Sequence, residues 1–148
     1  MMIAIDPGKS GAIAAVSNGK TQTWKMPQTP TDTARLLRFL SDEGYTTAYL
    51  EEVSGYAGGR GAPGSAMFTF GQVYAWIEMG LVMAGFQIIK VRPQKWQKTL
   101  GIGTSGGNKP EWKRKLKAKA QELFPGVDVT LVNADALLIL YTASKSLI

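Results

Sequence analysis

The order of its strands and helices predicts that this chain forms a single α/β domain over residues 1–148. We expect a mixed sheet of five strands flanked by helices, and two observations predict it. The first is a short antiparallel meander near the start, where Asn18-Gly19 gives a strong signal for a two-residue hairpin turn. The second is the alternation of helical and strand patterns after Pro30, which is typical of sheets that also contain parallel strands.

The first half of the chain is expected to contain four strands and one helix. Short runs rich in apolar or β-branched residues predict the strands, at 2–5, 11–16, 21–26 and 46–51. The helix follows Pro30, with Thr31 or Asp32 as its N-cap, and ends at Gly44. Its apolar positions repeat as expected for one buried face: Ala34, Leu36, Leu37 and Leu40.

The second half is expected to be mainly helical. Residues 54–64 contain five glycines and one proline, so we expect an irregular loop there. The remaining elements are predicted as a long helix at 65–85, a strand at 86–91, a short helix at 93–100, a loop at 101–108, a basic helix at 110–124 and an apolar helix at 133–148. No internal repeat or interdomain linker is evident.

The composition excludes several kinds of chemistry. The chain has no histidine and no cysteine, so it has no Ser-His or Cys-His pair, no imidazole ligand, no thiolate zinc site and no disulfide framework. Hydrolytic chemistry would have to use carboxylates, lysines, hydroxyls or a hard metal ion. We find no transmembrane run and no signal-peptide pattern, so we expect a protein of the cytoplasm with no membrane partner.

The charge is unevenly distributed along the chain. Residues 90–119 contain ten Lys or Arg and a single acid, Glu111, so this segment carries +9 while the rest of the chain carries −3. A concentrated positive charge next to an acidic region indicates a polyanion such as nucleic acid, held near a cation-binding centre. The alternative is an ordinary solvated face of a basic helix.

Three acidic positions stand where the predicted elements give them special geometry. Asp6 ends the first strand, Glu51 and Glu52 end the fourth, and Asp135 begins the last helix. If the first and fourth strands are parallel neighbours, their carboxyl ends converge at the edge where α/β sheets bind ligands. Carboxylates this close repel one another, and a hard cation such as Mg²⁺ relieves the repulsion. Two such ions can promote the hydrolysis of a phosphodiester without any histidine.

Each acid also has a simpler interpretation. Asp135 suits the first turn of a helix, where the dipole favours a negative charge. Asp6 could stabilise the turn that follows it or form a salt bridge with Lys9. One of Glu51 and Glu52 must face away from the other, because strand residues alternate between faces. The three positions taken together, beside the basic region, favour a metal site.

Five segments, in order along nearly the whole chain, resemble those of RuvC-type Holliday-junction resolvases, especially the short forms from phages and prophages. Each segment is weakly specific alone, and their order makes the set specific. They are Ile3–Gly11 around Asp6, Leu50–Val53 around Glu51, Phe68–Gln72 at the start of the long helix, Val91–Gln97 with Leu100–Ile102 before the basic helix, and Ala134–Ile139 around Asp135.

The resemblance implies an RNase H-like fold, a homodimer, and Mg²⁺-dependent nicking of symmetric strands in a four-way DNA junction, with Mn²⁺ able to substitute. Carried over by position, the metal ligands are Asp6, Glu51 and Asp135. Glu51 is preferred to Glu52 because the family's acid precedes a polar residue and then valine.

One position departs from the family's pattern. A fourth acid or histidine usually stands three residues before the last aspartate, and here that residue is Val132, which cannot bind a metal. Asn133 and Asp128 are the nearest polar side chains, and Asn133 is alternatively the N-cap of the final helix. A copy with three ligands could hold one of two metal ions weakly, or could be inactive.

The residues expected to contact DNA lie in three regions. In the basic helix we predict Lys109 and Lys113, which could also stabilise charge in the transition state, and Lys117 on the same face as Lys113. In the glycine-rich loop we predict Arg60. Of Phe68 and Phe70, two apart on a helix, we expect one in the core and one available to stack on a base.

The predicted function is therefore a metal-dependent, structure-selective endodeoxyribonuclease that resolves four-way junctions. One alternative is a less specific nuclease that trims branched or flapped DNA. The other is a junction-binding module without catalytic activity. The long helix at 65–85 is apolar on more than one side, so we expect it to pack against a second copy of the chain.

Overall fold

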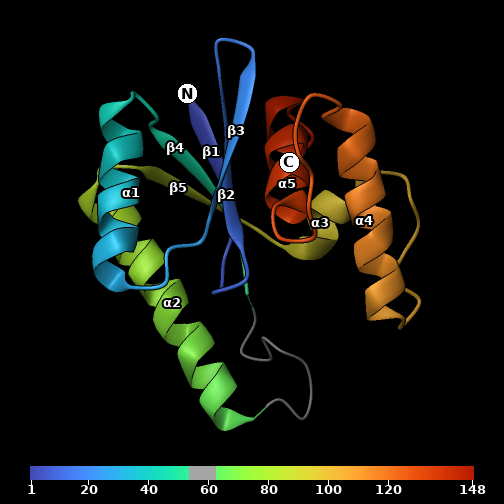
Figure 1. Cartoon of the computed structure of the whole chain (residues 1–148), viewed down its shortest axis with the longest axis horizontal. Coiled ribbons are helices and arrows are strands. Elements are labelled where there is room, and N and C mark those ends of the chain that lie inside the picture. The colour runs from blue at the N-terminus through green and yellow to red at the C-terminus, as the bar shows by residue number, and fades with distance from the viewer. Residues whose placement is uncertain (54–62) are drawn as a thin grey trace.

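The computed structural model describes residues 1–53 and 63–148, and its centre is a five-stranded mixed sheet (Figure 1). The strand order is β3-β2-β1-β4-β5, which places β1 in the middle. The strands are β1 (Met2–Asp6), β2 (Ala12–Ser17), β3 (Lys20–Lys25), β4 (Thr47–Glu51) and β5 (Gln87–Val91). The predicted α/β class and five-stranded sheet are confirmed.

The pairing within the sheet has the predicted mixture of directions. β1, β2 and β3 form the antiparallel meander, with Asn18 and Gly19 in left-handed conformations at the hairpin turn. β4 and β5 then run parallel to β1, and Ile5 pairs with Leu50. The next residues of the two strands are Asp6 and Glu51. They lie side by side and point to the same face, because paired residues of parallel strands share a face.

Helices cover both faces of the sheet, as Figure 1 shows. α1 (Pro30–Asp42) and α2 (Gly64–Met83) pack on one face, and α2 extends well past the end of the strands (Figure 1). The other face carries α3 (Pro93–Lys98), α4 (Lys109–Leu123) and α5 (Ala134–Ser144). Among the described residues, no helix is both long enough and apolar enough to cross a membrane.

Strand residues alternate between two hydrophobic cores. Ile3 and Ile5 belong to the core under α1 and α2, whereas Ala4 and two alanines of β2, Ala12 and Ala14, belong to the core under α5. Small side chains at these positions let α5 lie close to the middle of the sheet, and nine of its eleven residues are buried. The start of α5 is therefore fixed tightly against β1 and β2.

The N-terminus of α1 differs from the prediction of Thr31 or Asp32 as its cap. Thr29 is the N-cap, and its hydroxyl accepts a hydrogen bond from the backbone N–H of Asp32 at 3.1 Å. Pro30 occupies the first helical position, where the missing N–H costs nothing. The cap therefore precedes the proline, whereas the sequence prediction placed it after. The last helix also ends earlier than predicted, at Ser144.

The turn between β1 and β2 is closed by two glycines. Gly8 has a φ of +106°, and a Cβ there would lie 2.9 Å from Cε2 of Phe70 in α2. A Cβ on Gly11 would lie 2.0 Å from the backbone oxygen of Asp6. The Gly11 N–H donates to the Gly8 oxygen at 3.0 Å and its own oxygen accepts from Met26. The position of Asp6 thus depends on a turn that has no room for a side chain at Gly8 or Gly11.

We predict that Gly11→Ala lowers the free energy of unfolding by about 2–4 kcal/mol, because the new methyl group overlaps backbone atoms that cannot move aside easily. Gly71→Ala is the matched control. Gly71 is exposed in α2 and a Cβ there meets nothing, so this variant should gain about 0.5–1 kcal/mol. Urea denaturation followed by circular dichroism measures both, and equal stabilities would contradict the prediction.

Candidate active site

Two of the three predicted acids meet at the ends of neighbouring strands. Asp6 and Glu51 follow the paired residues Ile5 and Leu50, and both face the side of the sheet that α5 covers. Glu52 lies beyond the strand and pairs with Arg92, with 3.3 Å between its Oε2 and Nε of the arginine. The alternation of faces therefore places Glu51, and not Glu52, beside Asp6.

Asp135 reaches the same place from the first turn of α5. It is 4% exposed, since α5 packs against β1 and β2 at this point. Its Oδ2 accepts a hydrogen bond from the ammonium of Lys113 in α4, and its Oδ1 is buried without a hydrogen-bond partner among the described residues. One oxygen of this carboxylate is thus held by a cation, and the other has no partner among the described residues.

A tryptophan holds the glutamate. The indole Nε1–H of Trp96 in α3 donates to Oε2 of Glu51 at 2.7 Å, and the Trp96 side chain is fully buried. This contact is not among those predicted from the sequence. Trp96 is the fourth residue of α3, the short helix that follows β5, and β5 pairs with β4. The sequence signal that could have predicted the contact is a tryptophan that closely follows the strand beside the one that carries Glu51.

Burial raises the affinity of Asp6 and Glu51 for protons. The pKa of Asp6 is raised well above its ordinary value, mainly by burial and then by the negative charges of Asp135 and Glu51. Burial also raises the pKa of Glu51, to about 7, although the hydrogen bond from Trp96 opposes the shift. The pKa of Lys113 is raised because Asp135, Asp6 and Glu51 outweigh the desolvation of its ammonium. Excess negative charge is therefore the defining property of the site.

This donor set suits a hard divalent cation. All three acids offer oxygen ligands, their mutual repulsion calls for a positive charge, and the unpartnered Oδ1 of Asp135 is available to coordinate. Within residues 1–53 and 63–148, however, no three acidic side chains lie close enough to share one ion as they stand. Coordination by all three requires their side chains to shift toward one another.

Asn133 has a different role from the one expected of a helix cap. It occupies the N-cap position of α5, but its side chain makes no capping hydrogen bond. Its amide instead accepts from the Thr130 N–H at 2.8 Å and donates to the Asp128 backbone oxygen at 3.0 Å and to the Thr23 hydroxyl at 3.3 Å. The side chain therefore fixes the loop before α5 and joins it to β3, next to the non-ligating Val132.

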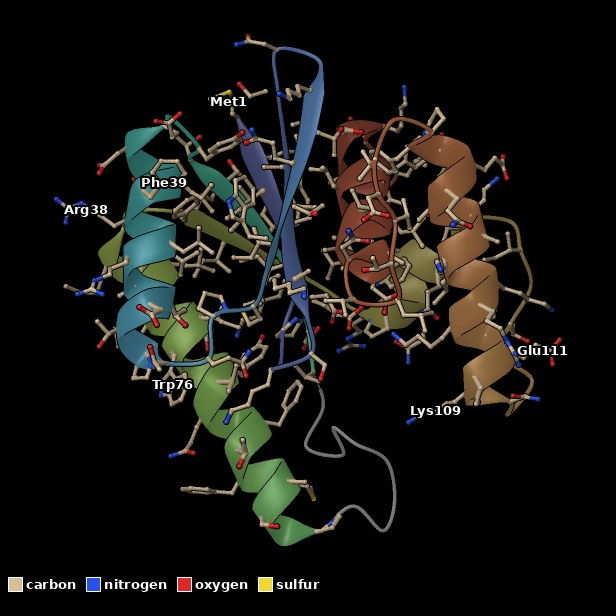
Figure 2. The ribbon with its side chains drawn as sticks, in the orientation of Figure 1. Met1, Arg38, Phe39, Trp76, Lys109 and Glu111 are labelled. Atoms are coloured by element: carbon tan, nitrogen blue, oxygen red, sulfur yellow. The ribbon has the colours of Figure 1, made fainter. Side chains whose placement is uncertain are left out.

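The predicted DNA contacts are only partly brought together. Lys113 reaches the acids, whereas Lys109 is exposed at the end of α4 (Figure 2), and Lys117 lies one helical turn beyond Lys113. Lys113, and not Lys9, is the cation that acts on Asp6. Arg60 lies outside the described residues.

The two phenylalanines at the start of α2 differ in their surroundings. Phe68 is 68% exposed, while Phe70 lies against the turn at Gly8. Of the pair, Phe68 is therefore the side chain with a free aromatic face, and Phe70 has a packing role. Trp96 and Trp112 are both buried, so neither has a free ring for stacking on a base.

Two solved structures share this architecture over nearly their full lengths. Thermus thermophilus RuvC matches with a TM-score of 0.60 and 16% identity, over 98% of this chain and 96% of that one. T. thermophilus RuvC in complex with a Holliday junction substrate matches with a TM-score of 0.62 and 15% identity, over 99% and 98%. No family model and no curated relative matches the sequence. The fold is therefore RuvC-type, as the sequence resemblance predicted.

The raised pKa of Glu51 predicts how stability depends on pH in metal-free protein. Its pKa is about 7 when folded and about 4.5 when exposed, so the folded state binds more protons between these values. The free energy of unfolding should fall by about 3 kcal/mol from this group as pH rises from about 4.5 to 7. Asp6 shifts in the same direction and adds to the fall.

Glu51→Gln should remove the glutamate's share of this dependence and retain an acceptor for Trp96. Glu52→Gln is the control, since the Glu52 side chain is 41% exposed and lies outside the site. This variant should leave the pH dependence of the free energy of unfolding unchanged. Urea titrations in EDTA at pH 5 and pH 8 give the measurement. If the free energy of unfolding changed equally between pH 5 and pH 8 in wild type and in Glu51→Gln, Glu51 would not be buried as described.

Proposed function

We propose that this RuvC-type chain is a cytoplasmic, structure-selective endodeoxyribonuclease that resolves four-way DNA junctions by metal-dependent phosphodiester hydrolysis. The observation that carries the proposal is the set of three carboxylates, Asp6, Glu51 and Asp135, at the end of two parallel strands beside a basic helix. Such a set has little structural value, because burying like charges destabilises a fold. It is explained by a cation that the site binds.

In this proposal Asp6, Glu51 and Asp135 are the ligands of Mg²⁺, which Mn²⁺ can replace. The ion would supply Lewis acidity for hydrolysis of the phosphodiester. Trp96 orients Glu51 through its 2.7 Å hydrogen bond, and Lys113 and Lys109 contribute positive charge toward the reacting phosphate. Burial by α5 limits the access of bulk water and so strengthens each of these interactions.

The proposed substrate follows from the position of the positive charge. α4 carries six basic residues and lies on the same face of the sheet as Asp6 and Glu51. Lysines on this helix, including Lys117, contact phosphates, and the exposed ring of Phe68 stacks on an unpaired base. Arg60, predicted from the sequence, stays a proposed DNA contact, and Phe70 supports the Gly8 turn beside Asp6. The neighbouring RuvC structure with a Holliday junction supports a branched substrate.

We also propose a homodimer formed through α2. Its solvent-facing side exposes Met79, Val82 and Met83, each more than half accessible. An apolar groove of about 550 Å³ runs between α1 and α2, next to these residues, and includes Trp76, which Figure 2 shows near the crossing of the two helices. Two related sites in a dimer would match the twofold arrangement of strands in a four-way junction.

A second candidate is a junction-binding module without catalytic activity. The observation in its favour is that no three acids of the described residues lie close enough to share one metal ion as they stand, while the ammonium of Lys113 is bound to Asp135. In that case the basic helix would bind DNA and Lys113 would permanently neutralise part of the acidic site. The experiment below separates this candidate from the nuclease.

We predict that Asp6→Asn reduces cleavage of a four-way junction by at least about a hundredfold and leaves junction affinity within about threefold, because phosphate contacts supply most of the affinity. Glu52→Gln removes the same charge outside the site and should retain activity. Cleavage is followed on labelled junction, flap and duplex DNA with Mg²⁺.

Each outcome of this assay has a distinct meaning. Undiminished cleavage by Asp6→Asn would overturn the proposed active site. Binding without cleavage by the wild type would favour the junction-binding module, and equal cleavage of flaps would indicate a less specific nuclease.

For the dimer, we predict that Val82→Glu converts the protein to a monomer, since a buried unpaired carboxylate opposes association. Leu147→Glu is the control, because Leu147 is also an exposed apolar residue but lies at the other end of the chain, away from α2. Light scattering coupled to gel filtration gives the mass. A dimer that survives Val82→Glu would place the interface elsewhere.

A further inference from the structure

We infer that Lys113 is a built-in second cation of the carboxylate site, so that each chain binds one divalent ion where a two-metal nuclease binds two. The inference rests on the proposed metal site, and it concerns how many ions that site takes. It goes beyond a general contribution of positive charge, because it assigns Lys113 the position and the charge of an ion.

The contacts of Asp135 allow a lysine and a metal ion together. Lys113 holds Oδ2, and Oδ1 is buried with no hydrogen-bond partner among the described residues. A carboxylate has two oxygens with separate lone pairs, so coordination through Oδ1 leaves the lysine contact intact. The ion therefore does not need to displace Lys113 in order to bind Asp135.

The position of Lys113 is well determined by the fold. Its neighbours on α4, Trp112 and Leu116, are buried in the core that α5 shares, so this side of α4 is fixed against α5. The Lys113 side chain is half exposed, while the Asp135 side chain that it contacts is 6% exposed. The ammonium thus lies at the boundary between the buried acids and the solvent, which is where a phosphate would approach.

A count of charges favours a single ion. Asp135 and Lys113 act on both Asp6 and Glu51, and Glu51 also acts on Asp6. When ionised, the three acids and the lysine carry a net charge of −2, and one Mg²⁺ neutralises it. A second Mg²⁺ would leave +2 in a largely buried site, which is costly in a low dielectric. Without Lys113 the three acids carry −3, and a second divalent ion becomes electrostatically acceptable.

The lysine could also perform the electrostatic task of a second ion. Hydrolysis forms a bond from a water oxygen to phosphorus and breaks the bond to the leaving oxygen, while water loses a proton and the leaving oxygen gains one. Negative charge increases on the phosphate oxygens during this exchange. A preorganised ammonium beside them stabilises that charge without being bound from solution.

Calorimetric titration of the DNA-free protein with Mn²⁺ tests the inference. Wild type should bind one ion per chain. Lys113→Met keeps the length of the side chain and removes its charge, so it should bind two ions, the first on the order of tenfold more tightly. Lys113→Arg keeps the charge and should bind one. Lys115→Met is the control, since Lys115 lies on α4 with an exposed side chain 3.9 Å from Glu111, and should bind one ion with wild-type affinity.

The outcomes separate this inference from the proposed function. Two ions in the wild type, or identical titrations of wild type and Lys113→Met, would overturn the role of Lys113 and leave the nuclease proposal intact. No Mn²⁺ binding by any of the variants would overturn the metal site itself. Circular dichroism of each variant, with and without Mn²⁺, establishes that a change in stoichiometry comes from a folded protein.

Discussion

The burial of negative charge at the end of β1 and β4 is the constraint on which the rest of this structure depends. Asp6 and Glu51 are adjacent because their strands are parallel, and Asp135 joins them because α5 lies on alanines. The surrounding residues then compensate for this charge. Trp96 donates to Glu51, Lys113 donates to Asp135, and the basic α4 lies on the same side of the sheet. A fold selected for stability alone would have no reason to keep this arrangement.

Much of the site follows from local sequence patterns. A strand that ends in an acid, repeated in two strands that are parallel neighbours, predicts that Asp6 lies beside one of Glu51 and Glu52, and the register of the pairing then selects Glu51. The interactions of Lys113 and Trp96 could not be derived in this way. They depend on how α3 and α4 pack across the sheet, and their partners lie 45 residues away for Trp96 and 22 for Lys113. Position in space decides such contacts, and spacing in the sequence does not.

The two predicted helix caps show the same limit on a smaller scale. At α1 the capping residue is Thr29, one position before the proline, although Thr31 and Asp32 carry equally suitable side chains. At α5 the residue in the N-cap position is indeed Asn133, but its amide binds the preceding loop and β3. In both cases several polar groups lie within reach of the same helix terminus or side chain, and the backbone conformation decides which of them forms the hydrogen bond.

The contact between Phe70 and the turn at Gly8 has a consequence for how a dimer would cut DNA. The turn holds Asp6 on one side, and α2, the proposed dimer helix, carries Phe70 on the other. The carboxylate site and the dimer helix are thus in direct contact through a ring packed on a glycine. In a dimer built on α2, the separation of the two scissile phosphates would be a fixed property of the protein. A flexible junction would then have to adapt its arms to that separation, and rigid duplex DNA would present no second phosphate at the right place.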